Sequence, residues 1–498
     1  MPDSPYGMDA LTGDFSEDGQ ILTQDTSVSG GGAKLTAVAL LVAGTFFMEN
    51  LDATVITPAV PQMAGSFSVS PVALNSGVSA YMLAVGIFIP ASGWMADRFG
   101  ARRVFGLAIL LFTIASLLCG LARTLPEFVI LRILQGLGGA MMVPVGRLVV
   151  LRVTPKDKLI DAIAMLTWPA LVAPVLGPPL GGWIVEYANW RWIFYLNLPL
   201  GVVACGLAWL IVPDTRHERG VGFDWPGFAF SGTALFCLLY MAELFGDPEI
   251  AWHTVLGLAG LGGVLLVLAV RHLRRVPHPM LDLSPLGLRS FSVTILGGSL
   301  FRMGVSAVPF LLPVMFQIGF GYSAFAAGAM LMAVFAGNLT MKMATTQVLR
   351  RFGFRPVLIV NGVFNALAIA ACAAIGPLLP VPVICAILFI GGATRSMQFT
   401  AFNTIAFADV PQPAMSAANT LFSTLFQLAM GLGVALGAIA WRAGEAMAPL
   451  GAAPAWPFRI AFLLVAAVSL IGVADSLALP RGAGANVSQG KVKEAKKP

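Results

Sequence analysis

Long apolar segments, separated by short polar loops, follow one another along most of the chain. Each is near the roughly 20 residues that an α-helix needs to cross the hydrocarbon core of a bilayer. By that length rule we count about fourteen such segments, the first over residues 35–60 and the last over 458–479. The pattern predicts an all-α polytopic membrane protein with about 14 transmembrane helices.

Composition and charge agree with this fold class. Hydrophobic residues make up 57% of the 498 positions and charged residues 11%, against about 25% charged residues in a soluble domain. The net charge of +6 does not indicate a nucleic-acid partner, because Lys and Arg gather on alternate loops between the apolar segments. The positive-inside rule therefore predicts that both termini lie in the cytosol.

The first segment carries charge where charge is costly. Residues 46–61 read FFMENLDATVITPAVP, so Glu49 and Asp52 lie inside a hydrophobic run. An ionisable group near the middle of a bilayer costs about 2.5 to 3.5 kcal/mol on insertion scales, and usually faces a protein interior or a water-filled path. Three residues apart, the two carboxyl groups share one face of a helix. We expect them to line a pathway and to carry protons; a structural ion pair with an intramembrane Arg is the alternative.

The loop after the second segment reads GWMADRFGARR over residues 93–103. This G-x-x-x-D-R-x-G-x-R-R pattern resembles the loop signature of the major facilitator superfamily of transporters. The resemblance implies two parallel six-helix halves around a central path, with substrate bound near the bilayer midplane. An acid among several bases can hold the inner mouth shut until the charge network breaks, although ordinary cytosolic anchoring is the alternative for some of the bases. The gating candidates are Gly93, Asp97, Arg98, Gly100, Arg102 and Arg103.

A second signature lies in the fourth segment, where residues 132–139 read RILQGLGG. This stretch resembles the R-x-x-Q-G-x-G pattern of the same superfamily. An Arg at this depth needs a carboxylate or a water path. The resemblance makes Arg132 a candidate for coupling proton movement to the acids of the first segment, and a purely structural pair with Asp52 is the alternative. Arg147, nearer the inner end, is interpreted as a snorkelling residue.

The fifth segment reads APVLGPPLGG over residues 173–182. It is similar to the G-x-x-x-G-P-x-x-G-G signature of proton-coupled exporters, with Ala173 in place of the first Gly. Proline interrupts the helical hydrogen-bond ladder and small residues let helices approach closely, so we expect a kinked, tightly packed hinge. Plain helix packing is the alternative. The hinge candidates are Pro174, Gly177, Pro178, Gly181 and Gly182.

Further stretches resemble one branch of the superfamily. Residues 190–201 read WRWIFYLNLPLG, residues 51–54 read LDAT, and residues 223–227 read FDWPG. These look like the fourteen-span drug:proton antiporters called DHA2, in which two extra helices are inserted between the halves. Residues 301–313 and 395–404 look like its bacterial HsrA-type exporters, which implies an inner-membrane location.

This resemblance divides the chain into five parts. They are a disordered cytosolic tail (1–33), a six-helix bundle (34–213), an inserted helix pair with cytosolic linkers (214–285), a second six-helix bundle (286–480) and a basic cytosolic tail (481–498).

Two more arginines, Arg302 and Arg395, lie deep inside predicted spans of the second half. Together with Arg132 they outnumber the deep carboxylates. Either some of them contact backbone carbonyls and water, or the site accepts an acidic substrate group, since the Arg fork suits carboxylates and phosphates. Lys342 is interpreted as snorkelling toward the inner side. The candidates for the substrate cavity are Arg302, Arg395, Gln398, Asn403 and Phe301.

The remaining chemistry argues against an enzyme. The five cysteines lie singly in apolar segments, the four histidines lie in loops or at span ends, and no cluster has the spacing of metal ligands or of a nucleophile with its base. We therefore expect no cofactor and no metal. The sequence predicts a monomeric, proton-coupled efflux transporter whose partners are a small molecule, protons and the lipid bilayer. A transporter of an anionic metabolite on the same fold, in either direction, is the alternative.

Overall fold

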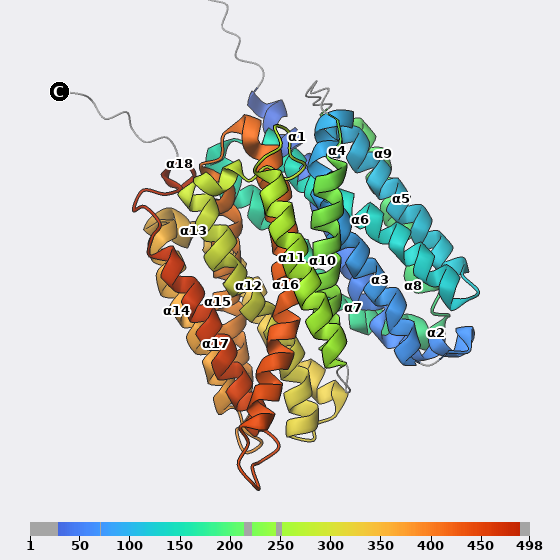
Figure 1. The fold of residues 1–498 in the computed structure, drawn as a ribbon, viewed down its shortest axis with the longest axis vertical. Helices are drawn as coiled ribbons and strands as arrows, with labels where there is room; N and C mark the ends of the chain where they lie inside the picture. Colours follow the sequence, from blue (N-terminus) through green and yellow to red (C-terminus); the bar gives the residue numbers. More distant parts are fainter. Residues whose placement is uncertain (1–27, 70, 214–221, 246–250, 489–498) are drawn as a thin grey trace, which may run out of the picture.

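The computed structural model describes residues 28–69, 71–213, 222–245 and 251–488, and its regular elements are helical throughout these ranges (Figure 1). In the described part of the chain, fourteen helical segments are long and apolar enough to cross a membrane. The predicted all-α polytopic fold with about 14 spans is therefore confirmed. Residues 1–27 and 489–498, which belong to the two predicted tails, lie outside the described residues.

The first half of the chain forms six spans, some of them built from two helices. Its helices are α1 (Val28–Val55), α2 (Val60–Phe67), α3 (Pro71–Phe88), α4 (Ser92–Phe99), α5 (Ala101–Leu121), α6 (Leu125–Val153), α7 (Leu159–Tyr187), α8 (Trp192–Tyr195) and α9 (Asn197–Ile211). The short turns η1 (Thr57–Ala59), η2 (Ile89–Ala91) and η3 (Lys156–Lys158) connect some of them.

The remaining spans follow in order. Their helices are α10 (Trp225–Leu244), α11 (Trp252–Leu273), α12 (Arg289–Val314), α13 (Ala324–Phe352), α14 (Phe354–Ala371), α15 (Val381–Ala408), α16 (Met415–Ala446), α17 (Trp456–Ser476) and α18 (Ala485–Ser488). Four short turns complete the chain: η4 (Ser284–Gly287), η5 (Met315–Gly319), η6 (Cys372–Ala374) and η7 (Gln412–Ala414).

The two halves pack their helices in the same way. In the first half α1 packs on α6, α7 and α9, and α6 also packs on α3 and α5. In the second half α12 packs on α15, α16 and α17, and α15 also packs on α13 and α14. Counted along each half, these are the same pairs of spans. The chain therefore contains two structural repeats.

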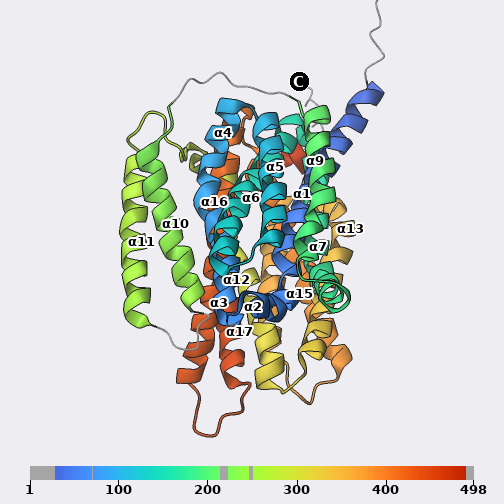
Figure 2. The same cartoon turned by 90° about the vertical axis from the view of Figure 1, so that its right-hand side faces the viewer.

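The helices α10 and α11 pack on each other and stand beside the two halves (Figure 2). Of this pair, α10 contacts α3 of the first half and α16 of the second. The pair thus covers one side of the seam between the halves. The exact domain boundaries along the sequence stay predictions.

Both described chain ends lie at one end of the bundle, which we call the terminal end; the opposite end is the far end (Figure 1). Helix α1 begins at Val28, inside the segment assigned to the first tail, and α18 packs on η3, α7 and α13 inside the segment assigned to the second. The apolar side chain of Val487 is buried there. The described part of the first predicted tail is therefore helical, and that of the second is a turn at 481–484 followed by the short helix α18.

Glycines set the same turn in both halves. Gly100 separates α4 from α5 with φ of 89°, and Gly353 separates α13 from α14 with φ of 75°. Side chains with a Cβ rarely adopt such angles, so glycine permits the sharp reversal between consecutive spans. Backbone geometry thus explains why the loop signature has a glycine at Gly100.

Candidate functional site

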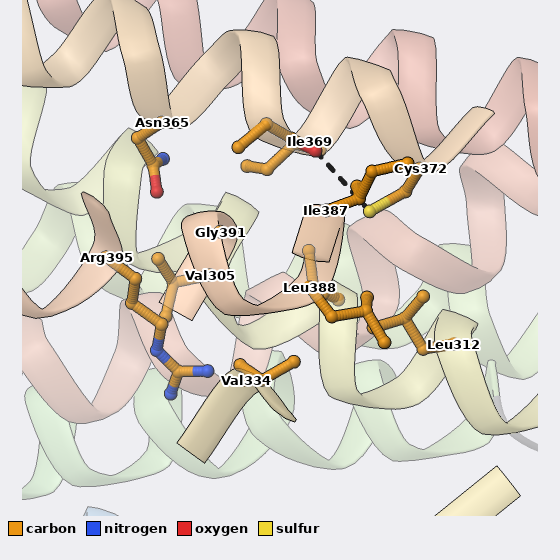
Figure 3. A pocket seen from close by; sticks show the side chains of 12 residues that line it. Val305, Leu312, Val334, Asn365, Ile369, Cys372, Ile387, Leu388, Gly391 and Arg395 are labelled. Carbon is orange, nitrogen blue, oxygen red and sulfur yellow. Dashed lines mark hydrogen bonds between the residues drawn. The ribbon is translucent and has the colours of Figure 1, made fainter. Parts of the chain in front are cut away.

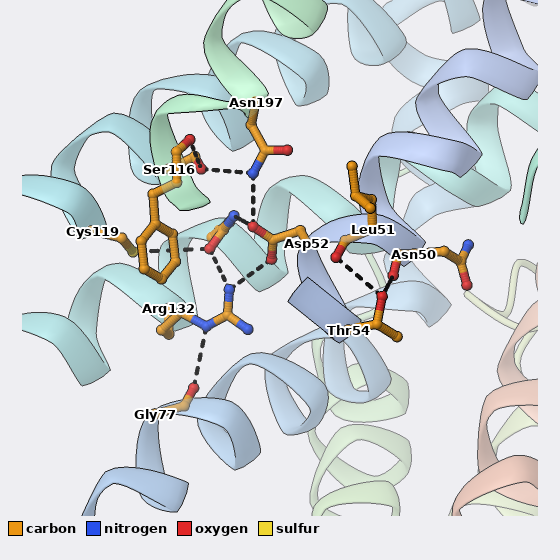
Figure 4. A network of polar contacts seen from close by, with 11 residues as sticks. Asn50, Leu51, Asp52, Thr54, Gly77, Ser116, Cys119, Arg132 and Asn197 are labelled. Carbon is orange, nitrogen blue, oxygen red and sulfur yellow. Dashed lines mark hydrogen bonds and ion pairs between the residues drawn. The ribbon is translucent and has the colours of Figure 1, made fainter. Parts of the chain in front are cut away.

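Asp52 lies at the centre of a buried polar network in the first half (Figure 4). Its Oδ2 accepts a hydrogen bond from Nη1 of Arg132 at 2.7 Å. Its Oδ1 accepts from Nε2 of Gln135 at 2.9 Å and from Nδ2 of Asn197 at 2.7 Å. Neither side chain of the Asp52–Arg132 ion pair is exposed to solvent. The carboxylate is therefore fully engaged by donors from α6 and α9.

Arg132 has further contacts in the same network. Its Nη1 also donates to Oε1 of Gln135 at 2.7 Å, its Nε donates to the carbonyl oxygen of Gly77, and its guanidinium lies 4.4 Å from the ring centre of Tyr81. In the sequence, Gln135 and Asn197 stand out only as parts of family signatures. Their amides hold Asp52, and this role was missed because single polar residues carry no spacing signal.

A cavity of about 420 Å³ lies between the two halves. Helices α1, α3, α6 and α7 line it from the first half, and α12, α13, α15 and α16 line it from the second. This size falls in the range of small-molecule binding pockets. Of the residues predicted from the sequence, the cavity is lined by Glu49, Pro174, Arg395 and Asn403.

The other predicted cavity residues do not line it. Phe301 packs on the ring of Phe402, and Gln398 is buried and donates to the carbonyl oxygen of Leu358. Arg302 donates to the carbonyl oxygen of Thr294 at 2.9 Å. Its guanidinium lies 4.9 Å from the ring centre of Phe422 and 5.2 Å from that of Phe426, both on α16. Each of these side chains is satisfied within the second half, which corrects their predicted place.

Glu49 and Asp52 do not share one space. Glu49 lines the cavity, whereas Asp52 does not, which corrects the expectation that both face one pathway. The Oε2 atom of Glu49 is buried and has no hydrogen-bond partner among the described residues. A buried carboxylate oxygen without a donor is costly, so this atom needs a proton, water or a ligand group.

Three cationic side chains share the cavity with Glu49. Lys342 donates to the hydroxyl oxygens of Thr167 at 2.7 Å and of Thr400 at 2.6 Å. Arg147 donates to the hydroxyl of Ser423 at 3.3 Å. Arg395 forms no hydrogen bond or ion pair within the described part of the chain. Lys342 and Arg147 therefore point into the cavity and do not snorkel to the membrane surface as the sequence suggested.

Arg395 also borders a smaller apolar pocket inside the second half (Figure 3). Val305, Val334, Asn365 and Leu388 line this pocket around it. Arg395 thus lies at the boundary between the central cavity and this smaller apolar pocket.

At the terminal end, contacts between the halves close the bundle. Nζ of Lys156 in η3 donates to the carbonyl oxygens of Phe407, Ala408 and Val410, which lie at and just past the end of α15, at 2.7, 2.9 and 2.8 Å. The carbonyls of Phe407 and Ala408 belong to the last turn of α15 and have no partner inside that helix, so a cation is favourable beside them. Lys156 therefore joins the two halves.

Two more contacts cross the seam at this end. Residues 349–355 of the second half read LRRFGFR, similar to ADRFGAR at 96–102 but with Arg350 in place of the acid. Arg350 pairs with Asp161 of α7 at 2.8 Å. A Cβ on Gly93 would overlap the side chain of Thr420 on α16, so glycine allows α4 and α16 to touch.

The other signature residues act within the first half. Asp97 pairs with Arg152 at 2.7 Å, and the guanidinium of Arg102 lies 5.8 Å from the ring centre of Trp209. Arg98 and Arg103 are exposed and form no ion pair in the described ranges. The gating candidates therefore separate into a close contact at Gly93, an ion pair at Asp97 and exposed cations.

The predicted hinge is a close crossing of α1 and α7. A Cβ on Gly177 would overlap the side chain of Thr54, and one on Gly181 would overlap the carbonyl oxygen of Val55. Gly182 has open space around it. Pro174 and Pro178 lie inside α7, where they interrupt the backbone ladder. The motif thus brings the helix that carries Glu49 against the helix that carries the prolines.

A separate polar contact anchors the inserted helix pair. Asp224 caps the start of α10 by accepting from the backbone N–H of Gly227 at 2.9 Å, and also contacts Nε2 of His272 at 2.8 Å and the N–H of Met280 at 3.2 Å. Partial burial raises the pKa of the Asp224 carboxyl, but the hydrogen bonds from His272 and from the backbone outweigh it and hold that pKa below its ordinary value.

Comparison with known proteins decides the family. The sequence matches the Major Facilitator Superfamily over residues 42–434. The chain belongs to this superfamily of transporters. It is 38% identical over 402 residues to the "Putative multidrug resistance protein MdtD" of Pectobacterium atrosepticum, covering 80% of this chain and 85% of the relative. The protein of the same name from Escherichia coli strain K12 is 38% identical over 400 residues, covering 80% and 84%.

Solved structures support the fold. The crystal structure of the human organic anion transporter MFSD10 superimposes with a TM-score of 0.62 at 15% identity, covering 89% of this chain and 99% of that one. The proton:xylose symporter XylE superimposes with a TM-score of 0.63 at 14% identity, covering 91% and 98%. At such identities the likeness shows the fold alone. The chain is a major facilitator transporter, not an enzyme.

Proposed function

We propose that this transporter exports small molecules in exchange for protons, as a member of the fourteen-span DHA2 branch and its HsrA-type subgroup. In this proposal it works as a monomer in a bacterial inner membrane with both termini in the cytosol. The observation that carries the proposal is Glu49, a carboxylate in the wall of the central cavity with an oxygen that no described residue satisfies. Ionisable groups in this position are typical of proton pathways.

The contacts at the terminal end support an outward-facing state. If the termini are cytosolic, then Lys156, Arg350 and Gly93 close the cytosolic side. A proton from outside then neutralises Glu49 and removes an acceptor from the substrate, so that the substrate leaves. Alternating access requires such a difference in substrate affinity between the states.

We assign the proton to Glu49 in preference to Asp52, because Asp52 keeps three donors and does not border the cavity. The Asp52–Arg132 pair then fixes α1 against α6. The crossing of α1 and α7 at Gly181 transmits a change at Glu49 to the proline-containing helix. These roles are parts of the same proposal.

A second candidate is a transporter of an anionic metabolite, in either direction. The presence of Arg147, Lys342 and Arg395 against the single carboxylate of Glu49 favours it. In that case protonation of Glu49 would add to the positive surplus, so a proton and the anion would bind together. An exchanger requires the opposite coupling, in which proton binding weakens substrate binding, because the proton must displace the substrate.

The two candidates differ in the direction in which protons move relative to the substrate, and this direction can be measured. In inside-out vesicles that have been acidified inside, a panel of lipophilic cations, neutral drugs and organic acids is added, and the internal pH is followed. Exchange predicts that a substrate drives proton release to the outside, and that Glu49→Gln abolishes the response. Proton movement in the same direction as an organic acid would overturn exchange and support the second candidate.

A further inference from the structure

We infer that the substrate is an amphipathic zwitterion or a similarly dipolar molecule, with an acidic group held by Lys342 and Arg395 and a hydrogen-bond donor held by Glu49. The inference rests on the proposed proton-coupled export and names the substrate class of that site. It uses Lys342, which the sequence placed outside the cavity.

The carboxylate and two of the three cations enter the cavity from opposite halves. Glu49 of α1 supplies the carboxylate from the first half, and Lys342 of α13 and Arg395 of α15 supply cations from the second. Arg147 also comes from the first half, but it donates to Ser423, and its guanidinium lies 5.2 Å from the ring centre of Phe422. The second-half wall is therefore cationic, whereas the first-half wall carries both Arg147 and Glu49, whose Oε2 atom has no hydrogen-bond partner among the described residues.

The cations of the second half lie on neighbouring turns of two helices in contact. A Cβ on Gly337 would overlap the backbone of Phe389, and one on Gly392 would overlap the backbone of Val334, so α13 and α15 touch along this stretch. Lys342 reaches Thr400 on α15, five residues or about one and a half turns beyond Arg395. We call these two cations, which line the cavity from adjacent helices, the second-half patch.

This patch has unused hydrogen-bonding capacity. Lys342 has three donors and uses two of them on threonine hydroxyls, while Arg395 has five and uses none within the described residues. Nearby, Oδ1 of Asn338 and Oγ of Ser396 line the cavity, are buried and lack a partner among the described residues. Cations in a lipid-embedded site need a partner, and a carboxylate or phosphate suits the Arg fork.

Aromatic side chains continue the site beyond the charges. Phe335, Phe399 and Phe426 line the same cavity. Phe399 is four residues after Arg395, and Phe335 is seven residues before Lys342, so each helix turns a ring and a cation to the same face. The occupant therefore needs an apolar frame beside its acidic group.

A zwitterionic substrate is also compatible with proton exchange, which requires that protonation of Glu49 weaken substrate binding. Its ammonium pairs with ionised Glu49, and its acid pairs with the second-half patch. Protonation of Glu49 removes the first of these contacts and weakens binding, whereas a simple anion would gain from the same proton. A zwitterionic substrate thus reconciles the cationic wall with proton exchange.

The test uses four probes on one naphthylalanine frame: the free amino acid, its amide, its N-acetyl derivative and its N-acetyl amide. They are zwitterion, cation, anion and neutral molecule of nearly equal shape. Binding is measured to the full-length protein in lipid nanodiscs. We expect the zwitterion to bind at least about tenfold more tightly than each of the other three, as paired charges away from water allow.

Variants assign the two contacts. Lys342→Gln and Arg395→Gln should weaken the zwitterion and the anion but leave the cation unchanged, and Glu49→Gln should weaken only the probes with a free ammonium. Lys158→Gln and Arg351→Gln, at exposed positions of the terminal end, are the matched controls. Charge-conserving Lys342→Arg and Arg395→Lys should restore the preference, which separates binding from folding.

Two outcomes overturn the inference: an anion that binds as tightly as the zwitterion, or a preference that survives both second-half substitutions. Failure of the proposed function has a different signature, in which the zwitterion binds as expected but drives no proton release in inside-out vesicles.

Discussion

Glu49 and Asp52 lie three residues apart on α1 and belong to different environments: Glu49 lines the cavity between the halves, and Asp52 is held inside the first half by Arg132, Gln135 and Asn197. Helical spacing places two such residues on neighbouring positions of one face. The close crossing of α1 with its neighbours nevertheless separates them. We therefore expect Glu49 and Asp52 to have different roles, although both lie on the same stretch of α1.

For Asp52, we expect Asn to act mainly on stability. Asp52→Asn removes the partner of Arg132 and leaves a buried cation without its counter-charge, which typically costs about 3 to 5 kcal/mol. Thermal unfolding of the purified protein in detergent measures the loss. Asp157→Asn, at an exposed position, is the control. An unchanged melting temperature for Asp52→Asn would show that the network is not structural.

At the crossing of α1 and α7 two neighbouring glycines should behave differently. Gly181→Ala places a methyl group against the carbonyl oxygen of Val55, and such overpacking typically costs about 1 to 3 kcal/mol. Gly182→Ala meets open space and should be neutral or slightly stabilising. Transport and thermal unfolding of both variants check this pair, and equal losses in the two would contradict the observed packing.

Closure of the terminal end should depend on Lys156. Lys156→Met removes hydrogen bonds from a charged donor, each worth about 1.5 to 3 kcal/mol, so the population open at this end should rise about tenfold or more. Spin labels on cysteines introduced at the exposed Phe99 and Phe352 report the opening as a longer distance. Lys158→Met is the control, and an unchanged distance distribution in Lys156→Met would refute the role of this contact.

The anchor of the inserted pair predicts a pH dependence. The pKa of Asp224 is lower in the folded protein than in the unfolded chain, where it is about 3.9. The unfolded state therefore binds more protons near that pH, and the stabilising contribution is full above the unfolded value and is lost as pH falls through the folded value. Unfolding midpoints measured between about pH 3 and 6 should fall less steeply at the acidic end in Asp224→Asn than in wild type. Parallel curves for the two proteins would count against the anchor.

The fold could be predicted because its signals are local. Apolar segment length gave the spans, and the glycines of the loop signature gave turns such as the one at Gly100. The contact of Gly181 with α1 also follows from small residues beside prolines. These features depend on backbone geometry, which a short stretch of sequence can determine.

The partners of the deep charges were harder to predict. Arg302 and Lys342 both lie in apolar runs, yet Arg302 is enclosed by its own half and Lys342 reaches the cavity. Which face of a helix meets the cavity depends on how the two halves are rotated against each other, and no local pattern encodes this. For the same reason the sequence could not tell Glu49 from Asp52.

Proton release on substrate binding tests directly whether Glu49 carries the exchanged proton. Purified protein in weakly buffered solution is mixed with a saturating amount of a probe that it binds, and a pH-sensitive dye records the protons released by wild type, Glu49→Gln and Asp52→Asn. We predict release from wild type and from folded Asp52→Asn, and none from Glu49→Gln although the probe still binds. Normal release from Glu49→Gln together with none from Asp52→Asn would contradict this prediction and return the proton to Asp52.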